Sequence, residues 1–419
     1  MNRSPHPAHA DIRRMPDDEN VLTPAFWERP PAERDQVFAR LRAEADLVFF
    51  PYAVAPGWPA STGYWAVTRY EDIAEVTRNP DAFSSEPTVY RLEEAAPPGD
   101  QGSMLNLDDP RHTRLRRIVA RSFTPRMLRT LEQDIRDIAR RVTADLAERG
   151  ACDFATHVAA AMPPDVICAM MGVPPSDRAI AVEVAELGMA MTDPNCTVPL
   201  DTFSAKLTEC LQLIEDLVHH RRDHPADDLI TALGLANSDG EYLTHSEIGS
   251  FFMTLVSAGV ETVRESLSNA LVFFTEDPDQ RELLRADFER WLAPAAEEIV
   301  RHCSPVAWIR RNVTQEHTLG SHTFHPGDRI ILCYASGNKD ETVFENPHRF
   351  DITRPPHPHL GYGGPGPHYC LGAQLARREI TTMLHELYSS LPGIHATEPP
   401  VRRQVGIISS IAHLPCAID

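Results

Sequence analysis

One cysteine lies between two stretches that differ strongly in amino-acid composition. In HLGYGGPGPHYCLGAQLARREI, residues 359–380, glycines and prolines precede Cys370 and a helical pattern follows it. A thiolate is the metal-binding form of cysteine, and the free N–H groups at the start of a helix lower the pKa of a nearby thiol. Glycine permits positive φ, so the backbone of such a loop can lie close against a flat ligand. The loop glycines are at 363, 364, 366 and 372. This combination makes Cys370 a candidate metal ligand.

Four roles for Cys370 are open on these residues. A lone cysteine is most often a buried structural residue. Nucleophilic pairing with His368 is disfavoured, because residues two apart do not face each other at the start of a helix. A zinc site lacks further ligands nearby in the sequence. A ligand to haem iron accounts for the whole stretch, because the backbone N–H groups can also hydrogen-bond to the sulfur.

The stretch resembles the cysteine loop of the cytochrome P450 superfamily, usually written F-G-x-G-x-H-x-C-x-G. Tyr362 stands where phenylalanine is usual, and one extra residue lies between it and the cysteine. This longer loop is similar to that of actinobacterial hydroxylases of sterols and methyl-branched lipids. The resemblance implies that the cofactor is heme b (iron protoporphyrin IX), that Cys370 ligates its iron, and that His368 and Gly372 contact it.

A basic segment resembles the part of this family that binds the haem propionates. DDPRHTRLRRIV contains His112 and Arg116, one helical turn apart, and Arg311 matches a further propionate contact. Arginine suits carboxylates because its guanidinium can donate to both oxygens at once. The alternative for the segment is a solvated basic helix.

An ExxR motif precedes the cysteine loop. EEIVRHCSPV supplies Glu298 and Arg301, which lie on one face of a helix at i, i+3 spacing, and NPHRF supplies Arg349. In the family, three such residues form a buried charged triad that steadies the cysteine loop. A surface ion pair is the alternative for an ExxR motif on its own.

The segment SAGVETV resembles the family signature A-G-x-[DE]-T on the helix over the haem. The resemblance implies that Ala258 and Gly259 form a thin spot where O₂ and substrate approach the iron. It also implies that Glu261 and Thr262 pass protons to bound oxygen. Valines flank the Glu-Thr pair where the family often has asparagine and a second threonine, so the relay is expected to rely more on water. The alternative for Thr262 is a hydroxyl that bonds back to its own helix.

The predicted elements make a mainly α chain with small β-sheets. THSE, residues 244–247, is a capping box, and its helix can continue to Glu276, before Asp277-Pro278. Helical periodicity also covers 126–149 and about 203–222, and strands are expected at 64–68, 318–324 and 329–333. The resemblance implies the cytochrome P450 fold, with its long central helix over the haem, in a single domain, 1–419. Its β-rich parts are expected near 50–70, 305–335 and 395–419, and its helical core at 70–300 and 370–390.

Composition narrows the classes of partner. The 419 residues include 40 basic and 60 acidic side chains, and the net charge of −20 argues against nucleic acid as a partner. No apolar run reaches the roughly eighteen residues of a membrane span, and the polar N-terminus lacks a signal peptide's apolar core, so no membrane anchor is expected. The 8 cysteines are scattered without a CxxC motif, which favours a reducing, cytoplasmic location.

The resemblance implies a haem-thiolate monooxygenase that inserts one atom of O₂ into a hydrophobic small molecule, such as a terpenoid, steroid, lipid or polyketide-like skeleton. The chain has no flavin or iron–sulfur motif, so electrons from NAD(P)H are expected through a ferredoxin reductase and a ferredoxin. The alternative chemistry is epoxidation, desaturation or carbon–carbon coupling in secondary metabolism. The alternative class is a non-catalytic haem-binding protein.

Two surfaces are expected to serve this reaction. A basic face would steer an acidic electron donor. Its arginines are Arg116, Arg117, Arg121, Arg377 and Arg378. A largely apolar pocket would hold the substrate. By family position it is lined by 85–104, 185–205, Ala258, Val260, Ala307, Trp308 and the hairpin near Ser410-Ile411.

Overall fold

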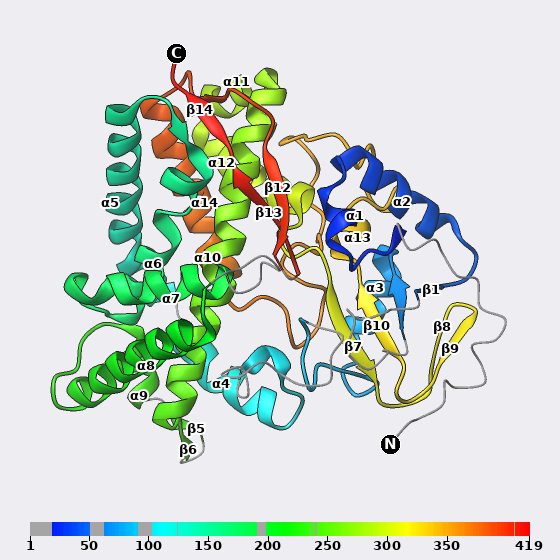
Figure 1. Ribbon diagram of the computed structural model, residues 1–419, viewed down its shortest axis with the longest axis horizontal. Coiled ribbons are helices and arrows are strands. Elements are labelled where there is room, and N and C mark those ends of the chain that lie inside the picture. Colours follow the sequence, from blue (N-terminus) through cyan, green and yellow to red (C-terminus); the bar gives the residue numbers. More distant parts are fainter. Residues whose placement is uncertain are drawn as a thin grey trace.

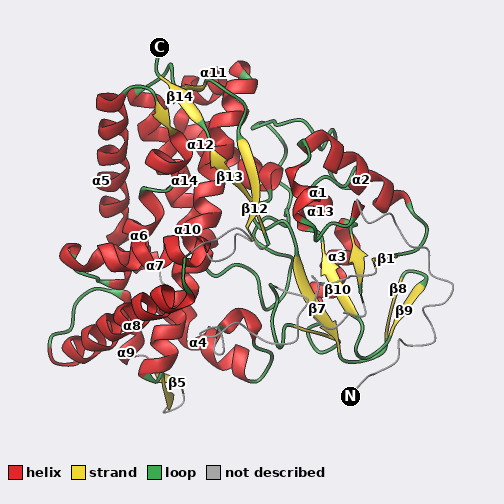
Figure 2. Cartoon of the chain, in the orientation of Figure 1, coloured by secondary structure: helices red, strands yellow, loops and turns green. Residues whose placement is uncertain are grey.

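The structure is a computed structural model of the chain. It describes residues 19–50, 63–90, 103–123, 125–190, 198–235, 237–238, 241–405 and 407–419. Helices dominate one side of the molecule, and a mixed sheet together with several shorter helices forms the other (Figure 1; Figure 2). No helix among the described residues is both long and apolar enough to cross a membrane.

The helices confirm the mainly α prediction. They are α1 (Pro24–Glu28), α2 (Pro31–Ala43), α3 (Tyr70–Arg78), α4 (Arg111–Ser122), α5 (Pro125–Arg149), α6 (Met162–Met171), α7 (Arg178–Ala190), α8 (Leu200–Asp223), α9 (Leu229–Leu235), α10 (His245–Glu276), α11 (Pro278–Ala286), α12 (Phe288–Cys303), α13 (Tyr334–Gly337) and α14 (Ala373–Ser390). The expected helices at 126–149 and 203–222 are therefore α5 and α8.

The strands are short, and the largest sheet among the described residues is a mixed sheet of five strands. Its order is β1 (Val48–Phe50), β2 (Tyr64–Val67), β10 (Arg329–Leu332), β7 (Ile309–Val313) and β3 (Phe83–Ser84). β10 runs parallel to β2, with Ile330 beside Trp65, and antiparallel to β7. The remaining strands are β4 (Cys152–Asp153), β5 (Asn237–Ser238), β6 (Glu241–Tyr242), β8 (His317–Leu319), β9 (His322–Phe324), β11 (His395–Ala396), β12 (Val401–Val405), β13 (Ile408–His413) and β14 (Pro415–Ala417).

The long helix α10 begins with the capping box that the sequence predicts. The Glu247 N–H donates to the Thr244 hydroxyl at 3.1 Å, and the Thr244 N–H donates to the Glu247 carboxylate at 2.8 Å. The helix has 32 residues, or about 48 Å at 1.5 Å per residue. It packs against α6, α8, α12 and α14, and most of its residues are buried. It therefore runs through the centre of the helical half of the molecule (Figure 1).

Two predicted boundaries are wrong. The expected strand at 318–324 is a hairpin of β8 and β9, because Gly320 adopts a φ of 59° and turns the chain between them. The helix after the cysteine begins at Ala373, with Gly372 as its N-cap, rather than at residue 370, where the helical core was expected to begin. Cys370 therefore lies two residues before the N-cap.

Candidate functional site

Cys370 is exposed to solvent, yet the surrounding protein raises the pKa of its thiol above the usual value through desolvation. The N–H of Gly372 and the cations Arg116 and Arg377 act in the opposite direction and favour the thiolate. The predicted lowering of this pKa is thus outweighed by desolvation, because only one N–H of the helix start acts on the sulfur.

The glycine-rich loop is shaped partly by its contact with α3. A Cβ on Gly364 would lie 2.4 Å from the Thr77 hydroxyl oxygen, and one on Gly366 would lie 2.1 Å from the Thr77 carbonyl oxygen. A Cβ on Gly372 would meet nothing within 4 Å. The glycines at 364 and 366 are therefore required by packing within the protein. Gly372 is the one that leaves free space beside Cys370.

The predicted propionate ligands lie together. The imidazole rings of His112 and His368 have centroids 4.1 Å apart. Burial, together with the positive charges of Arg311, His112 and Arg116, lowers the pKa of His368 to about 2. Arg116 also acts on the pKa of Cys370, so this cationic cluster adjoins the cysteine.

The cationic cluster fits an anionic ligand. The Nε2 atom of His112 is buried and has no hydrogen-bond partner among the residues that the structure describes. Arg311 is buried, and its Nη1 donates to the neighbouring Arg310 carbonyl oxygen at 3.0 Å. A carboxylate in the cluster would accept from these donors and offset the repulsion between them. Together with an accessible thiol, this donor set fits a haem group with its propionates.

Glu261 does not point into open space. Nη1 of Arg264 donates to both of its carboxylate oxygens, at 2.9 and 3.1 Å, and the Ser410 hydroxyl donates to it at 2.7 Å. The same hydroxyl lies 2.9 Å from Glu265, and burial together with the charge of Glu261 raises the pKa of Glu265 to about 7. Nη2 of Arg264 donates to the Ile411 carbonyl oxygen. Glu261 is thus part of a buried network that joins α10 to β13.

Most of α10 is buried, but its middle has a strip of residues that are accessible to solvent. This accessible strip consists of Ser257, Ala258, Gly259 and Thr262. The Thr262 hydroxyl donates to the Ala258 carbonyl oxygen at 2.7 Å, so it does bond back to its own helix. A Cβ on Gly259 would lie 2.8 Å from Cδ1 of Ile167. The absence of a side chain at Gly259 therefore allows α6 to pack closely, and Ala258 and Thr262 provide the open face.

The charged triad forms, but its third member is not the predicted one. Nε and Nη2 of Arg301 each donate to a carboxylate oxygen of Glu298 at 2.7 Å, and both residues are buried. The second arginine on Glu298 is Arg354, whose Nε lies 3.1 Å from Oε2. The Arg349 side chain is exposed, and only its carbonyl oxygen takes part, accepting from Arg354 at 3.0 Å. Arg349 was the wrong choice because the NPHRF turn directs its backbone, not its guanidinium, towards the network.

Two arginines of the expected basic face, Arg377 and Arg378, have acidic partners. Arg377 donates to Glu297 at 2.5 and 3.0 Å, and Arg378 lies 3.4 Å from Glu132. Arg116 donates to the Tyr369 carbonyl oxygen at 2.5 Å. The Arg121 side chain lies outside the described residues. The positive charge near the cysteine loop is therefore partly neutralised.

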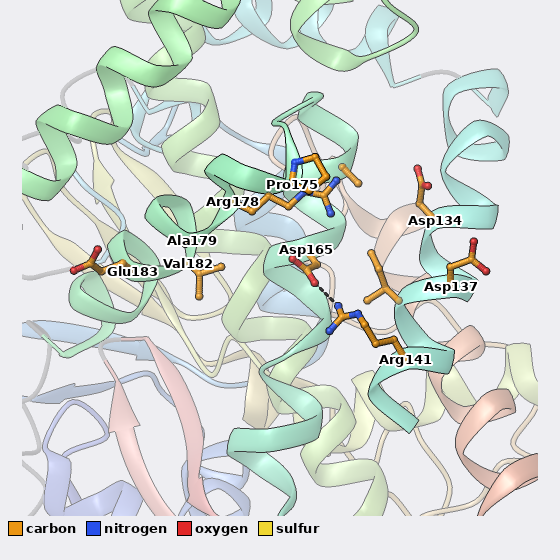
Figure 3. Close-up of a pocket in the computed structure, with 11 residues that line it drawn as sticks. Asp134, Asp137, Arg141, Asp165, Pro175, Arg178, Ala179, Val182 and Glu183 are labelled. Carbon is orange, nitrogen blue, oxygen red and sulfur yellow. Dashed lines mark hydrogen bonds and ion pairs between the residues drawn. The ribbon is translucent and has the colours of Figure 1, made fainter. Parts of the chain in front are cut away.

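The expected substrate pocket is described only in part. Residues 91–102 and 191–197 lie outside the described residues. Ala307, Trp308, Ser410 and Ile411 are buried, whereas Ala258 is accessible. A separate surface pocket of about 700 Å³ lies between α5, α6 and α7, where an ion pair joins Arg141 to Asp165 (Figure 3). None of its lining residues belongs to the predicted site.

Comparisons with known proteins agree with this site. The family profile described as Cytochrome P450 matches residues 196–390. A methyl-branched lipid omega-hydroxylase of Mycobacterium tuberculosis is 39% identical over 93% of this chain and 92% of that protein. A steroid C26-monooxygenase of Mycolicibacterium smegmatis is 34% identical over 95% of this chain and 93% of that protein.

Solved structures show the same fold. A Mycobacterium marinum cytochrome P450 in complex with pseudoionone superposes with a TM-score of 0.87 at 34% identity, covering 98% of this chain and 100% of that one. A Bacillus megaterium cytochrome P450 in complex with corticosterone gives 0.80 at 26% identity, covering 92% and 99%. The identities, their coverage and the shared fold place the chain in the cytochrome P450 family, as a monooxygenase of the bacterial type.

Proposed function

We propose that this cytochrome P450 hydroxylates a hydrophobic molecule of the branched-lipid or steroid class. The observation that carries the proposal is the 39% identity to a methyl-branched lipid omega-hydroxylase over 93% of the chain. The similarity to steroid C26-monooxygenases supports it, at 34% identity over 95% of the chain. The accessible strip of α10 consists of Ala258, Gly259 and the two hydroxyl residues Ser257 and Thr262, none of which is charged. Such a surface suits a substrate without charge at the position that reacts.

The proposed cofactor is heme b, which when bound supplies the iron that activates O₂. Cys370 would ligate the iron through its sulfur, and Gly372 leaves room beside it. His112, Arg116 and Arg311 would hold the propionates, with His368 completing the cluster. Ser85 lies 3.1 Å from Nε2 of His368, which fixes the orientation of that ring.

Thr262 is the proposed proton-handling residue of the open face. Its own proton is directed to the Ala258 carbonyl oxygen, so its oxygen keeps lone pairs that can accept a hydrogen bond. A water held by this oxygen would stand in the accessible strip. Thr262 would thus position the water that delivers protons, which agrees with a relay that relies on water.

Glu261 has a different proposed role. A proton route through its carboxylate requires that Arg264 and Ser410 first release it. Removing a charge from such a buried network costs several kcal/mol, about 3–5. In the described arrangement Glu261 therefore anchors α10 to β13, and it enters the relay only if that ion pair opens.

In the proposed electron path, NAD(P)H reduces a ferredoxin reductase, the reductase reduces a ferredoxin, and the ferredoxin reduces this protein. The proposed domain organisation is a single domain, 1–419. The partly neutralised basic face still presents Arg116 beside Cys370. An acidic donor would meet positive charge on the side of the molecule that holds the cysteine loop.

Substrate binding to the ferric protein tests the proposed substrate class. The haem-loaded protein is titrated with a methyl-branched fatty acid, a sterol and an acyclic terpenoid, and the haem absorption spectrum is followed. Products are then identified after turnover with a ferredoxin and its reductase. A hydroxylated branched lipid or steroid supports the proposal. An epoxide, alkene or coupled product, or binding restricted to other compounds, contradicts it.

A further inference from the structure

A cluster of three possible metal ligands lies at the surface, in a part of the sequence distant from the cysteine loop. Its members are Glu215, His219 and His245. Glu215 and His219 are four residues apart on α8 and so share a face of that helix, and His245 is the first residue of α10. One ligand atom of each residue lies within 4.8 Å of the other two. We propose that these three side chains bind a divalent transition-metal cation of the Zn²⁺ type, which ties α8 to the start of α10.

The distances suit such an ion. Nδ1 of His245 lies 3.5 Å from Oε1 of Glu215, and the rings of His219 and His245 meet edge to face with centroids 4.5 Å apart. Zn²⁺ binds imidazole nitrogen and carboxylate oxygen at about 2.0–2.2 Å, so two ligand atoms of a tetrahedral site lie about 3.3–3.5 Å apart. Small rotations of exposed side chains bring the three atoms to that separation.

The donor set has the chemistry of a zinc site. Two imidazoles and one carboxylate suit Zn²⁺, Cu²⁺ or Ni²⁺ better than Mg²⁺ or Ca²⁺, which prefer oxygen ligands alone. Three protein ligands leave a fourth position for water. The side chains of Glu215 and His245 are 48% and 25% exposed, so an ion can reach them.

The local charges favour a cation. Arg221, in the last turn of α8, is directed away to Asp228 at 2.6 Å, and Arg114 is bound by Glu247 at 2.7 Å. His219 lies near the C-terminal end of α8, where the helix dipole attracts positive charge.

A metal at this place would act as a cross-link. α8 and α10 contact each other, and the chain between them passes through α9, β5 and β6 (Figure 1). Because the ion binds only when both helices are in place, it would stabilise the folded protein and raise its melting temperature.

Zn²⁺ binding by the haem-loaded, untagged protein tests the site. The protein is first dialysed against a chelator, and Zn²⁺ is then titrated by calorimetry while melting temperature is measured in parallel. We expect saturable binding and a higher melting temperature. Glu215→Gln, His219→Ala and His245→Ala should each weaken the binding about 10–100-fold or more, at least as much as loss of an outer-shell partner does.

His220→Ala is the matched control, because His220 is an exposed neighbour on the same helix whose ring stacks on His224. It should leave the affinity unchanged. Glu215→Gln keeps the size of an exposed side chain, so it gives an answer even if a histidine variant fails to fold. Absence of Zn²⁺ binding overturns the proposal. So does a loss of binding in His220→Ala with none in His219→Ala or Glu215→Gln, which would place the ion on the stacked pair.

Discussion

Arg301→Ala should strongly destabilise the protein, because Arg301 is at the centre of the buried ionic network. Its guanidinium makes two 2.7 Å bonds to Glu298, and Nη1 donates to the carbonyl oxygens of Asn338 at 2.7 Å and Pro347 at 3.0 Å. Its loss leaves the buried Glu298 carboxylate with Arg354 and the Asp351 N–H, which donates to it at 3.0 Å. Removing one partner of a buried ion pair costs about 3–5 kcal/mol.

That loss can be expressed as a melting temperature. An unfolding entropy of about 2.1 cal/mol/K per residue gives about 0.9 kcal/mol/K for 419 residues. A loss of 3–5 kcal/mol therefore lowers the melting temperature by about 3–6 °C, provided that unfolding is cooperative. We also expect less soluble, haem-loaded protein, because the network holds the chain before the cysteine loop through Asn338, whose side chain accepts from the Leu360 N–H.

Arg349→Ala is the matched control. Its side chain is exposed and its part in the network is a backbone carbonyl oxygen, which alanine retains. Its effect should stay within about 0.5 kcal/mol, as for most surface substitutions. Soluble yield, haem content and melting temperature are compared for both variants. Wild-type values in Arg301→Ala, or equal damage in Arg349→Ala, would refute the assignment.

Three further predictions concern the site itself. Cys370→Ala should abolish the strongly red-shifted Soret band of the ferrous–CO complex, and a variant that keeps this band would exclude Cys370 as the ligand. Thr262→Ala should leave the substrate-induced spectral shift nearly intact but divert NAD(P)H consumption to hydrogen peroxide; unchanged product per NAD(P)H would show that Thr262 is only a helix residue. Glu265→Gln should gain stability relative to wild type as pH rises from about 4.5 to about 7, because burial raises the pKa of Glu265 to about 7 and the folded wild-type protein holds a proton there that the unfolded chain releases. A difference in melting temperature that does not vary with pH would contradict this reasoning.

Local patterns in the sequence were enough to predict the long helix and its start. The capping box at Thr244 is complete within four residues, and Asp277-Pro278 ends the helix whatever surrounds it. The members of the cationic cluster could also be named from the sequence, because each lies in or near a motif of the family. His112, Arg116, Arg311 and His368 come from α4, β7 and the cysteine loop, and the structure brings them together.

Contacts between segments that are distant in the sequence could not be predicted from such local patterns. Arg349 and Arg354 are five residues apart in one irregular segment, and nothing in their spacing shows which guanidinium turns inward. Nothing in the cysteine loop itself shows that Gly364 and Gly366 pack against Thr77, almost three hundred residues earlier. The Glu215, His219 and His245 grouping was missed because it joins two helices with no shared motif.

The separation of Glu261 from Thr262 shows why a motif alone does not define a mechanism. Adjacent residues on an α-helix point about 100° apart, since a turn holds 3.6 residues. On α10, the Glu261 side chain points towards Arg264 and Ser410 of β13, and the Thr262 side chain lies on the accessible strip with Ala258. The Glu261 carboxylate is therefore held by its buried partners, whereas the Thr262 oxygen lies on the accessible strip and can still accept a hydrogen bond. In the proposed relay, a route through Glu261 requires the Glu261–Arg264 pair to open, and a route that reaches Thr262 through water breaks no buried ion pair.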